Sequence, residues 1–254
     1  MNTWVNLAVA GGTWLFPAAV VGIFSCRLRF QKDLKVLPEE ERHTLETKVQ
    51  ELAHKLKICK KLEIREISGL ELGAQAMGNV IFPGRAGVII DPYFFECLTP
   101  ETQEFFVAHE ISHIKHHDSL TLCLVAGVAS MVTTIALSVL FPRSADLSSG
   151  KWYGGVACSG GVAAGMFTYS LASQWREKCA DKTAFSVCSP EAQAAAIEFF
   201  EDCRSIYRGY RNEEGISFLS SVWRKTRIMA EGEDRLDILH PFLKDRINYL
   251  KEGV

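Results

Sequence analysis

The sequence lacks several features that would place it in common classes of protein. It has no excess of basic residues, because 28 lysines and arginines face 30 aspartates and glutamates and the formal net charge is −2. A chain with this balance has no electrostatic footprint for a phosphate backbone, and we expect no nucleic-acid partner. It also has no internal repeat and no low-complexity tract, which excludes repeat architectures and a largely disordered chain.

Closely spaced cysteine pairs are also absent. The chain has eight cysteines, and no two of them form a Cys-x-x-Cys pair. They are spread over the whole length, at Cys26, Cys59, Cys97, Cys123, Cys158, Cys179, Cys188 and Cys203. This scatter favours reduced thiols in a cytosol-facing protein over a disulfide framework.

Charge is missing from three long windows of the sequence. Trp4–Cys26, Ser119–Pro142 and Trp152–Trp175 contain no Asp, Glu, Lys, Arg or His. Each is longer than the roughly 20 residues that a helix needs to cross the hydrocarbon core of a bilayer. We therefore expect three membrane-spanning helices.

The first window is predicted to be a retained anchor and the other two a helical hairpin. No basic region precedes the first window, whereas Arg27 and Arg29 follow it directly, so a cleaved signal peptide is disfavoured. Only "RSADLSSGK" separates the second and third windows. Small residues recur every fourth position at Ala157, Gly161 and Gly165, a spacing that lets two membrane helices approach closely. The alternative is a buried hairpin in a soluble protein.

The remaining residues have the mixed composition of a soluble domain in two halves. The predicted order is an anchor at 1–26, a first half at 27–118, the hairpin at 119–175 and a second half at 176–254. An amphipathic helix follows Pro38, and "LEIREIS", "AQAMGNVIF" and "AGVIID" have the pattern of short strands. Thr99 and Pro100 are typical of a helix start. The predicted fold is mainly α with a small β-sheet (α+β).

The motif "HEISH" is the strongest chemical signal in the chain. On a helix, positions four apart share a face, so His109 and His113 can direct two imidazoles at one ion, with Glu110 beside them. In an H-E-x-x-H motif, neutral imidazoles bind zinc and the glutamate deprotonates a water bound to it. An amphipathic helix with surface histidines is the alternative interpretation.

A catalytic zinc needs a third protein ligand, and the segment "REKCADKTA" after the hairpin offers one. Glu177 is the candidate ligand. Asp181 follows one helical turn later, where a carboxylate can hold a ligating histidine in place.

Four segments together resemble the HtpX-like membrane zinc metalloproteases, the group that includes the CAAX prenyl proteases and the Oma-type proteases. They are "NVIFPGRAGVIID", "HEISHIKHHD", "REKCADKTA" and "HPFLKDRI", with the apolar hairpin between the second and third. The resemblance implies a gluzincin-type core in which one zinc ion is bound by His109, His113 and Glu177, with Glu110 as general base. It also implies that a substrate peptide lies along the strand containing Asn79, Val80 and Ile81.

The same resemblance bears on two residues near the C-terminus. It places His240 in the cleft, where its side chain can stabilise the oxyanion of a tetrahedral intermediate, although simple packing is an equal alternative. Arg246 is expected to form an ion pair, either structural or catalytic.

The resemblance implies a zinc metalloendopeptidase that acts on polypeptides, with misfolded or membrane proteins as the expected substrates and a role in protein quality control. An inactive membrane scaffold of the same fold and a soluble secreted protease are the alternatives. Basic residues are more numerous on the flanks of the soluble halves than in the loop with Arg143 and Lys151. The positive-inside rule then predicts a multi-pass protein in contact with membrane lipid, with its site facing the cytosol. A cell inner membrane is expected, and a mitochondrial membrane stays open.

Overall fold

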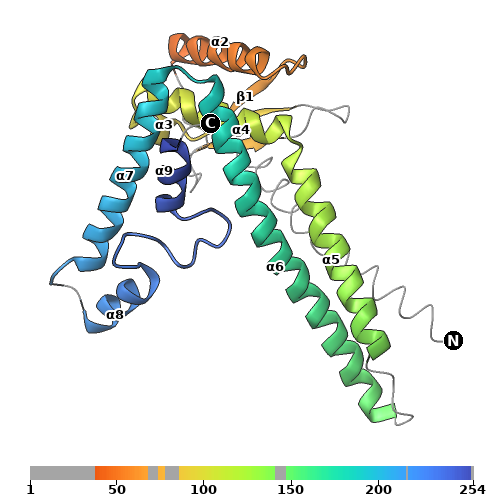
Figure 1. The fold of residues 1–254 in the computed structure, drawn as a ribbon. Coiled ribbons are helices and arrows are strands. Elements are labelled where there is room, and N and C mark those ends of the chain that lie inside the picture. The colour runs from red at the N-terminus through yellow and green to blue at the C-terminus, as the bar shows by residue number, and fades with distance from the viewer. Residues whose placement is uncertain (1–37, 68–73, 78–85, 141–146, 216, 253–254) are drawn as a thin grey trace. The chain divides into compact units, whose positions relative to one another are not determined.

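The computed structural model describes residues 38–67, 74–77, 86–140, 147–215 and 217–252 (Figure 1). The predicted N-terminal anchor at 1–26 lies outside the described residues. The chain divides into two compact units, one formed by residues 33–118 with 174–254 and the other containing residues 119–173.

The larger unit contains a small sheet and most of the helices. Its elements are α2 (Glu39–Lys55), β1 (Glu63–Glu66), β2 (Ala74–Met77), β3 (Gly87–Ile90), α3 (Pro92–Glu96), α4 (Pro100–Lys115), α7 (Pro190–Asn212), α8 (Phe218–Arg227) and α9 (Leu243–Lys251). The three predicted strands are present, and the prediction of a mainly helical fold with a small sheet is confirmed.

The sheet has the order β1-β3-β2, with β1 parallel and β2 antiparallel to β3. All four residues of the central strand β3 are buried. Gly87 opens this strand, where a Cβ atom would lie 1.9 Å from the backbone oxygen of Glu63 on β1. Only glycine permits that close approach of the two backbones, and the sheet depends on it.

Helix α4 runs through the core of this unit and begins as the sequence predicts. The Thr99 hydroxyl accepts a hydrogen bond from the Thr102 amide, and Pro100 occupies the first turn. Phe105, Ile111 and Ile114 are completely buried in the same hydrophobic core as residues of α2, the sheet, α7 and α9. A helix enclosed in this way can hold polar side chains only where they find partners, because an unpaired buried polar group is costly.

The other unit contains most of two helices, α5 (Asp118–Leu140) and α6 (Leu147–Val187), which run side by side in Figure 1. The end of α6, from residue 174, belongs to the larger unit. A Cβ atom on Gly161 would lie 2.0 Å from the Thr134 hydroxyl, and one on Gly165 would lie 3.1 Å from the Ala126 backbone oxygen. The predicted close approach at the small residues is therefore confirmed.

Within the described residues, α5 is the helix long and apolar enough to cross a membrane, with a mean hydropathy of 2.2 over a window that is 22% buried. Helix α6 contains the third uncharged window and continues without a break to Val187. The predicted boundary at residue 175 therefore falls inside one helix, and a second crossing stays a prediction.

Candidate metal centre

Two histidines of α4 and one glutamate of α6 converge in the larger unit. The Nε2 atom of His109 lies 3.3 Å from Oε2 of Glu177, and that of His113 lies 3.2 Å from Oε1. The two Nε2 atoms are 3.0 Å apart. One ligand atom from each side chain thus lies within 4.8 Å of the other two. The structure brings together the three residues that were proposed as ligands from the sequence.

The spacing of these donor atoms fits a small divalent ion. Zinc binds imidazole nitrogen and carboxylate oxygen at about 2.0–2.2 Å, so neighbouring donors around a tetrahedral ion lie about 3.3 Å apart. The two Nε2 atoms are 3.0 Å apart, and each lies close to a different oxygen of Glu177, at 3.3 and 3.2 Å, so the carboxylate can meet an ion held between the two imidazoles. Three protein donors also leave one position for water or substrate, which is the arrangement of a catalytic site rather than a structural one.

The opposite nitrogen of each imidazole faces a buried carboxylate. Nδ1 of His109 lies 2.9 Å from Oδ1 of Asp181, at hydrogen-bond distance but without ideal hydrogen-bond geometry. Nδ1 of His113 lies 2.6 Å from Oδ2 of Asp118. Such contacts hold the ring in place and leave Nε2 as the atom directed at the ion.

Each of these carboxylates is in turn held by an arginine. Nε and Nη2 of Arg246 donate to Asp181 at 2.8 and 2.5 Å, and the Tyr249 hydroxyl donates to the same group. Burial raises the pKa of Asp181, but the charge of Arg246 and the contact with His109 outweigh it and lower that pKa to about 2. Arg176 pairs with Asp118 and also donates to the His116 backbone oxygen at 2.6 Å.

A role for Asp118 at the metal centre was not predicted from the sequence. This residue was treated only as the last one before the uncharged window. Its position in "HEISHIKHHD", five residues after His113, was the available signal. Arg246, for which an ion pair was expected, pairs with Asp181 and so acts on the site through that carboxylate.

The ligands are electrostatically suited to an ion. Burial raises the pKa of Glu177, but its contacts with His109 and His113 lower it well below its usual range. Burial lowers the pKa of each histidine, yet the neighbouring carboxylates raise both above the usual value. Because a metal needs the neutral imidazole, protons and metal compete for Nε2, and metal affinity must fall in acid.

Glu110 lies beside the ligands on α4 and is buried. Its charge contributes to the raised pKa of His113, which places the carboxylate near the centre. Among the described residues, no hydrogen bond to this carboxylate is present, so its oxygens remain available to accept a proton.

His240 lies in the segment between α8 and α9, and its Nδ1 is 2.8 Å from Oδ1 of Asp237. Burial lowers its pKa, but the Asp237 contact and the charge of Glu177 raise it overall. A role of His240 at the centre stays a prediction. His116, which follows the motif on the same helix end, contacts the Thr183 hydroxyl at 3.1 Å.

The predicted substrate strand, which contains Asn79, Val80 and Ile81, lies outside the described residues.

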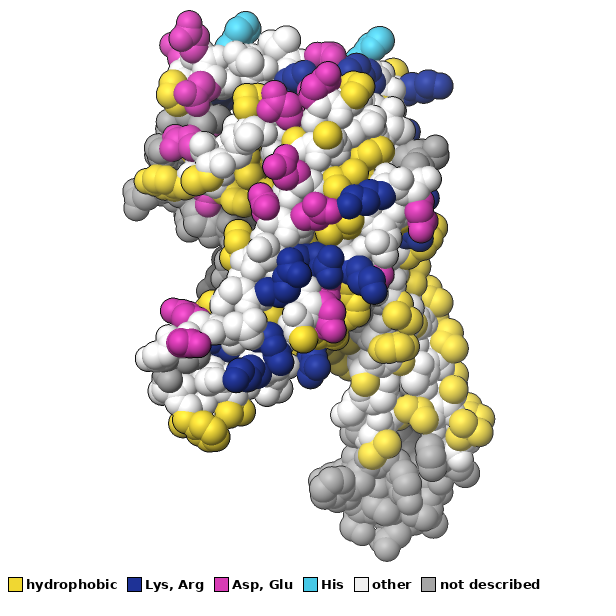
Figure 2. Space-filling view, turned by 60° about the vertical axis from the view of Figure 1, so that its left-hand side comes forward, with side chains coloured by type: hydrophobic (Ala, Val, Ile, Leu, Met, Phe, Trp, Pro, Cys, Tyr) yellow, Lys and Arg dark blue, Asp and Glu magenta, His cyan; other side chains and the backbone are white. Residues whose placement is uncertain are grey.

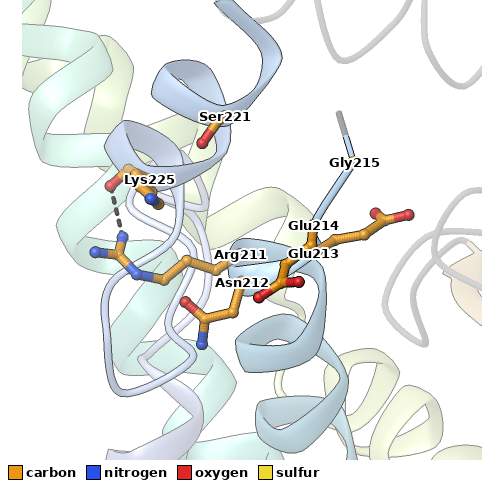
Figure 3. Close-up of a pocket in the computed structure, with 7 residues that line it drawn as sticks. All are labelled: Arg211, Asn212, Glu213, Glu214, Gly215, Ser221 and Lys225. Atoms are coloured by element: carbon orange, nitrogen blue, oxygen red, sulfur yellow. Dashed lines mark hydrogen bonds between the residues drawn. The ribbon is translucent and has the colours of Figure 1, made fainter. Parts of the chain in front are cut away.

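A hollow at the junction of α7 and α8 includes none of the ligands (Figure 3). Arg211 donates from Nη1 to the Lys225 backbone oxygen at 2.7 Å, and Glu213 pairs with Arg224. These contacts fasten α8 to the end of α7, so the polar groups here have a structural role.

Comparison with known proteins agrees with this geometry. The model of peptidase family M48 matches residues 39–254, which is most of the chain. A protease HtpX homolog of Methanocaldococcus jannaschii is 32% identical over 128 residues, covering 50% of this chain and 44% of the relative, so the match spans less than half of that protein. No solved structure matches. The family match includes both ligand-bearing helices, and the chain belongs to peptidase family M48.

Proposed function

We propose that this chain is a membrane-anchored zinc endopeptidase. The observation that carries this proposal is the convergence of His109, His113 and Glu177, with one possible ligand atom from each side chain within 4.8 Å of the other two. The family is one of metal-dependent peptidases, which supports hydrolysis of peptide bonds as the reaction.

The residues around the ligands have separate roles in this proposal. Zinc, when bound, supplies Lewis acidity, which makes water a nucleophile at neutral pH and polarises a peptide carbonyl. Glu110 accepts the proton of the attacking water and delivers it to the leaving amine. Asp181 and Asp118 keep the imidazoles of His109 and His113 in the orientation that binding requires.

His240 is proposed to donate a hydrogen bond from Nε2 to the oxyanion that develops on the substrate carbonyl. Asp237 supports this role, because its contact with Nδ1 fixes the ring and favours a protonated imidazole. A substrate peptide is proposed to add to the sheet along Asn79, Val80 and Ile81 by main-chain hydrogen bonds, so sequence preference would be loose.

A membrane location is supported by the apolar helix α5 and by the similarity to a relative named a protease HtpX homolog. We place the chain as a multi-pass protein in a cell inner membrane, with the metal centre on the cytosolic side. Misfolded or membrane-embedded polypeptides are the proposed substrates, and protein quality control is the proposed role.

The test is zinc content measured beside cleavage of an unfolded test protein by the detergent-purified full chain. Glu110→Gln should keep stoichiometric zinc and lose about 100-fold or more in turnover, the scale for removing a general base. Glu177→Ala should lose the metal, because two protein ligands remain. His43→Ala, on the exposed face of α2, is the matched control and should change neither measurement.

Two outcomes would contradict the proposal. A wild-type chain that binds zinc and cleaves nothing would identify the inactive scaffold, and a Glu110→Gln variant with wild-type turnover would refute the assigned base.

A further inference from the structure

Helix α8 presents its apolar face outward. Phe218, Leu219, Val222 and Trp223 are exposed by 80, 78, 46 and 56%, and the helix has no buried residue. An amphipathic helix in a soluble domain normally packs that face on the core. A contiguous exposed cluster of large apolar side chains marks a surface that meets a partner or a membrane.

The orientation of α8 is fixed by its polar side. The Arg224 guanidinium lies 3.9 Å from the centre of the Tyr210 ring on α7 and pairs with Glu213. At the end of the helix, Arg227 donates two hydrogen bonds to Asp234, at 2.8 and 2.6 Å. Because these contacts use the polar face, rotation of the apolar face toward the protein would break them.

Cations without a carboxylate partner lie beside this apolar face. Residues 204–227 contain six arginines and lysines, of which Arg204, Arg224 and Arg227 pair with Glu233, Glu213 and Asp234. Lys225 lies two turns after Phe218 and Arg227 one turn after Trp223, so cations flank both edges of the face. Among the described residues, neither Arg208 nor Lys225 has a carboxylate partner. Figure 2 shows Lys and Arg side chains gathered above an apolar tip in this region.

We propose that α8 lies in the interface of an anionic phospholipid bilayer, with Phe218, Leu219 and Trp223 among the acyl chains and headgroups and the cations against phosphates. Aromatic and aliphatic residues opposite arginines and lysines are the pattern of an interfacial helix. Anionic lipid offers phosphates to Arg208 and Lys225, whereas a second copy docking through α8 would bring two such sets of cations together.

The inference uses the proposed membrane anchoring for one purpose only. A chain held in a bilayer by α5 keeps α8 at a high local concentration of lipid surface, so a short helix is sufficient. The lipid contact of α8 and the insertion of α5 are separate properties, and a measurement can distinguish them.

The test is fluorescence quenching of Trp223 in the full chain, reconstituted into vesicles with brominated acyl chains. The Trp223 signal is the difference between the wild type and Trp223→Phe. In phosphatidylcholine vesicles with about a third phosphatidylglycerol, bromine should quench most of this signal, with less quenching in phosphatidylcholine alone. Salt should weaken the preference, since the screening length falls to roughly 3 Å at 1 M.

Charge variants identify the anionic partner. Arg208→Gln with Lys225→Gln should shift the equilibrium between quenched and unquenched Trp223 by about fivefold per charge removed. Lys61→Gln with Lys244→Gln removes two exposed charges outside residues 204–227 and should leave the quenching unchanged. The remaining tryptophans, which include Trp175 of α6, report insertion of the chain itself.

Three results would overturn the inference. Trp223 that stays unquenched while the other tryptophans are quenched would leave the anchoring intact and remove α8 from the lipid. Equal quenching with and without phosphatidylglycerol would remove the role of the cations. Shielding of Trp223 that grows with the protein-to-lipid ratio would identify a second copy as the partner instead.

Discussion

Each ligand histidine contacts a carboxylate that an arginine holds in turn, and we call each such set of residues a clamp. The two clamps are built from different parts of the chain. His109 is oriented by Asp181 of α6, which the α9 residues Arg246 and Tyr249 hold. His113 is oriented by Asp118, which Arg176 holds at the point where α5 begins. Asp181 is completely enclosed, while the pair at Asp118 lies where the chain enters and leaves the apolar helices. The first clamp therefore lies among helices of the larger unit, and the second is formed by the two residues that adjoin the apolar segment 119–175.

Removing the enclosed carboxylate should have the largest effect. Asp181→Ala leaves the Arg246 guanidinium buried without its counter-charge, and losing one partner of a buried pair costs about 3–5 kcal/mol. Thermal unfolding of the detergent-purified chain should show a lower midpoint even when zinc is in excess. A loss below about 1 kcal/mol would mean that the two clamps do not differ in this way.

Changing the second clamp to an uncharged side chain of the same shape should weaken the metal site. Asp118→Asn keeps an oxygen that can accept from His113 but removes the charge that faces Arg176. Metal affinity, measured by chelator competition, should fall about 10–100-fold. Asp237→Asn, which changes the partner of His240, is the control and should keep zinc affinity while lowering turnover. Unchanged affinity in Asp118→Asn would remove Asp118 from the site.

A buried carboxylate away from the metal gives the smallest and most pH-dependent effect. Glu104 of α4 accepts from the Ser189 amide and from Lys48, each at 2.9 Å. Burial raises its pKa, but these two contacts outweigh burial and lower it below the usual value of a glutamate. A depressed folded-state pKa gives stability that is complete above the unfolded value and lost as the pH falls through the folded value.

Glu104→Gln should therefore cost about 1 kcal/mol at pH 7, because Lys48 is partly exposed and the buried amide contact dominates. The difference from the wild type should shrink as the pH falls below about 4.5, the unfolded value. Unfolding midpoints at several pH values measure it, and a pH-independent difference would contradict the assignment.

The sequence predicts the parts of this molecule that depend on local spacing. His109 and His113 are four residues apart on one helix, and Thr99 with Pro100 marks where that helix begins, so both were accessible from the pattern. The close contact at Gly161 and Gly165 also follows from a regular interval. Glu177 required the combination of an upstream motif with a second segment, since a lone glutamate on a helix has no distinctive spacing.

The clamps were harder to predict because they join residues far apart in the chain. Arg176 and Asp118 are 58 positions apart, and Tyr249 and Asp181 are 68 apart. No periodicity connects such pairs, and only the packing of α4, α6 and α9 brings them together. The exposure of the apolar face of α8 could not be predicted either, because amphipathic spacing identifies an apolar face without indicating whether it faces the core or the solvent.

The contact between Asp118 and Arg176 has a topological consequence. The ion pair joins Asp118, the residue before segment 119–175, to Arg176, the residue after it. The two ends of that segment are therefore held together. Arg176 reinforces the closure by binding the His116 backbone oxygen. For the domain that carries the ligands, the two apolar helices are thus a single insertion with fixed ends.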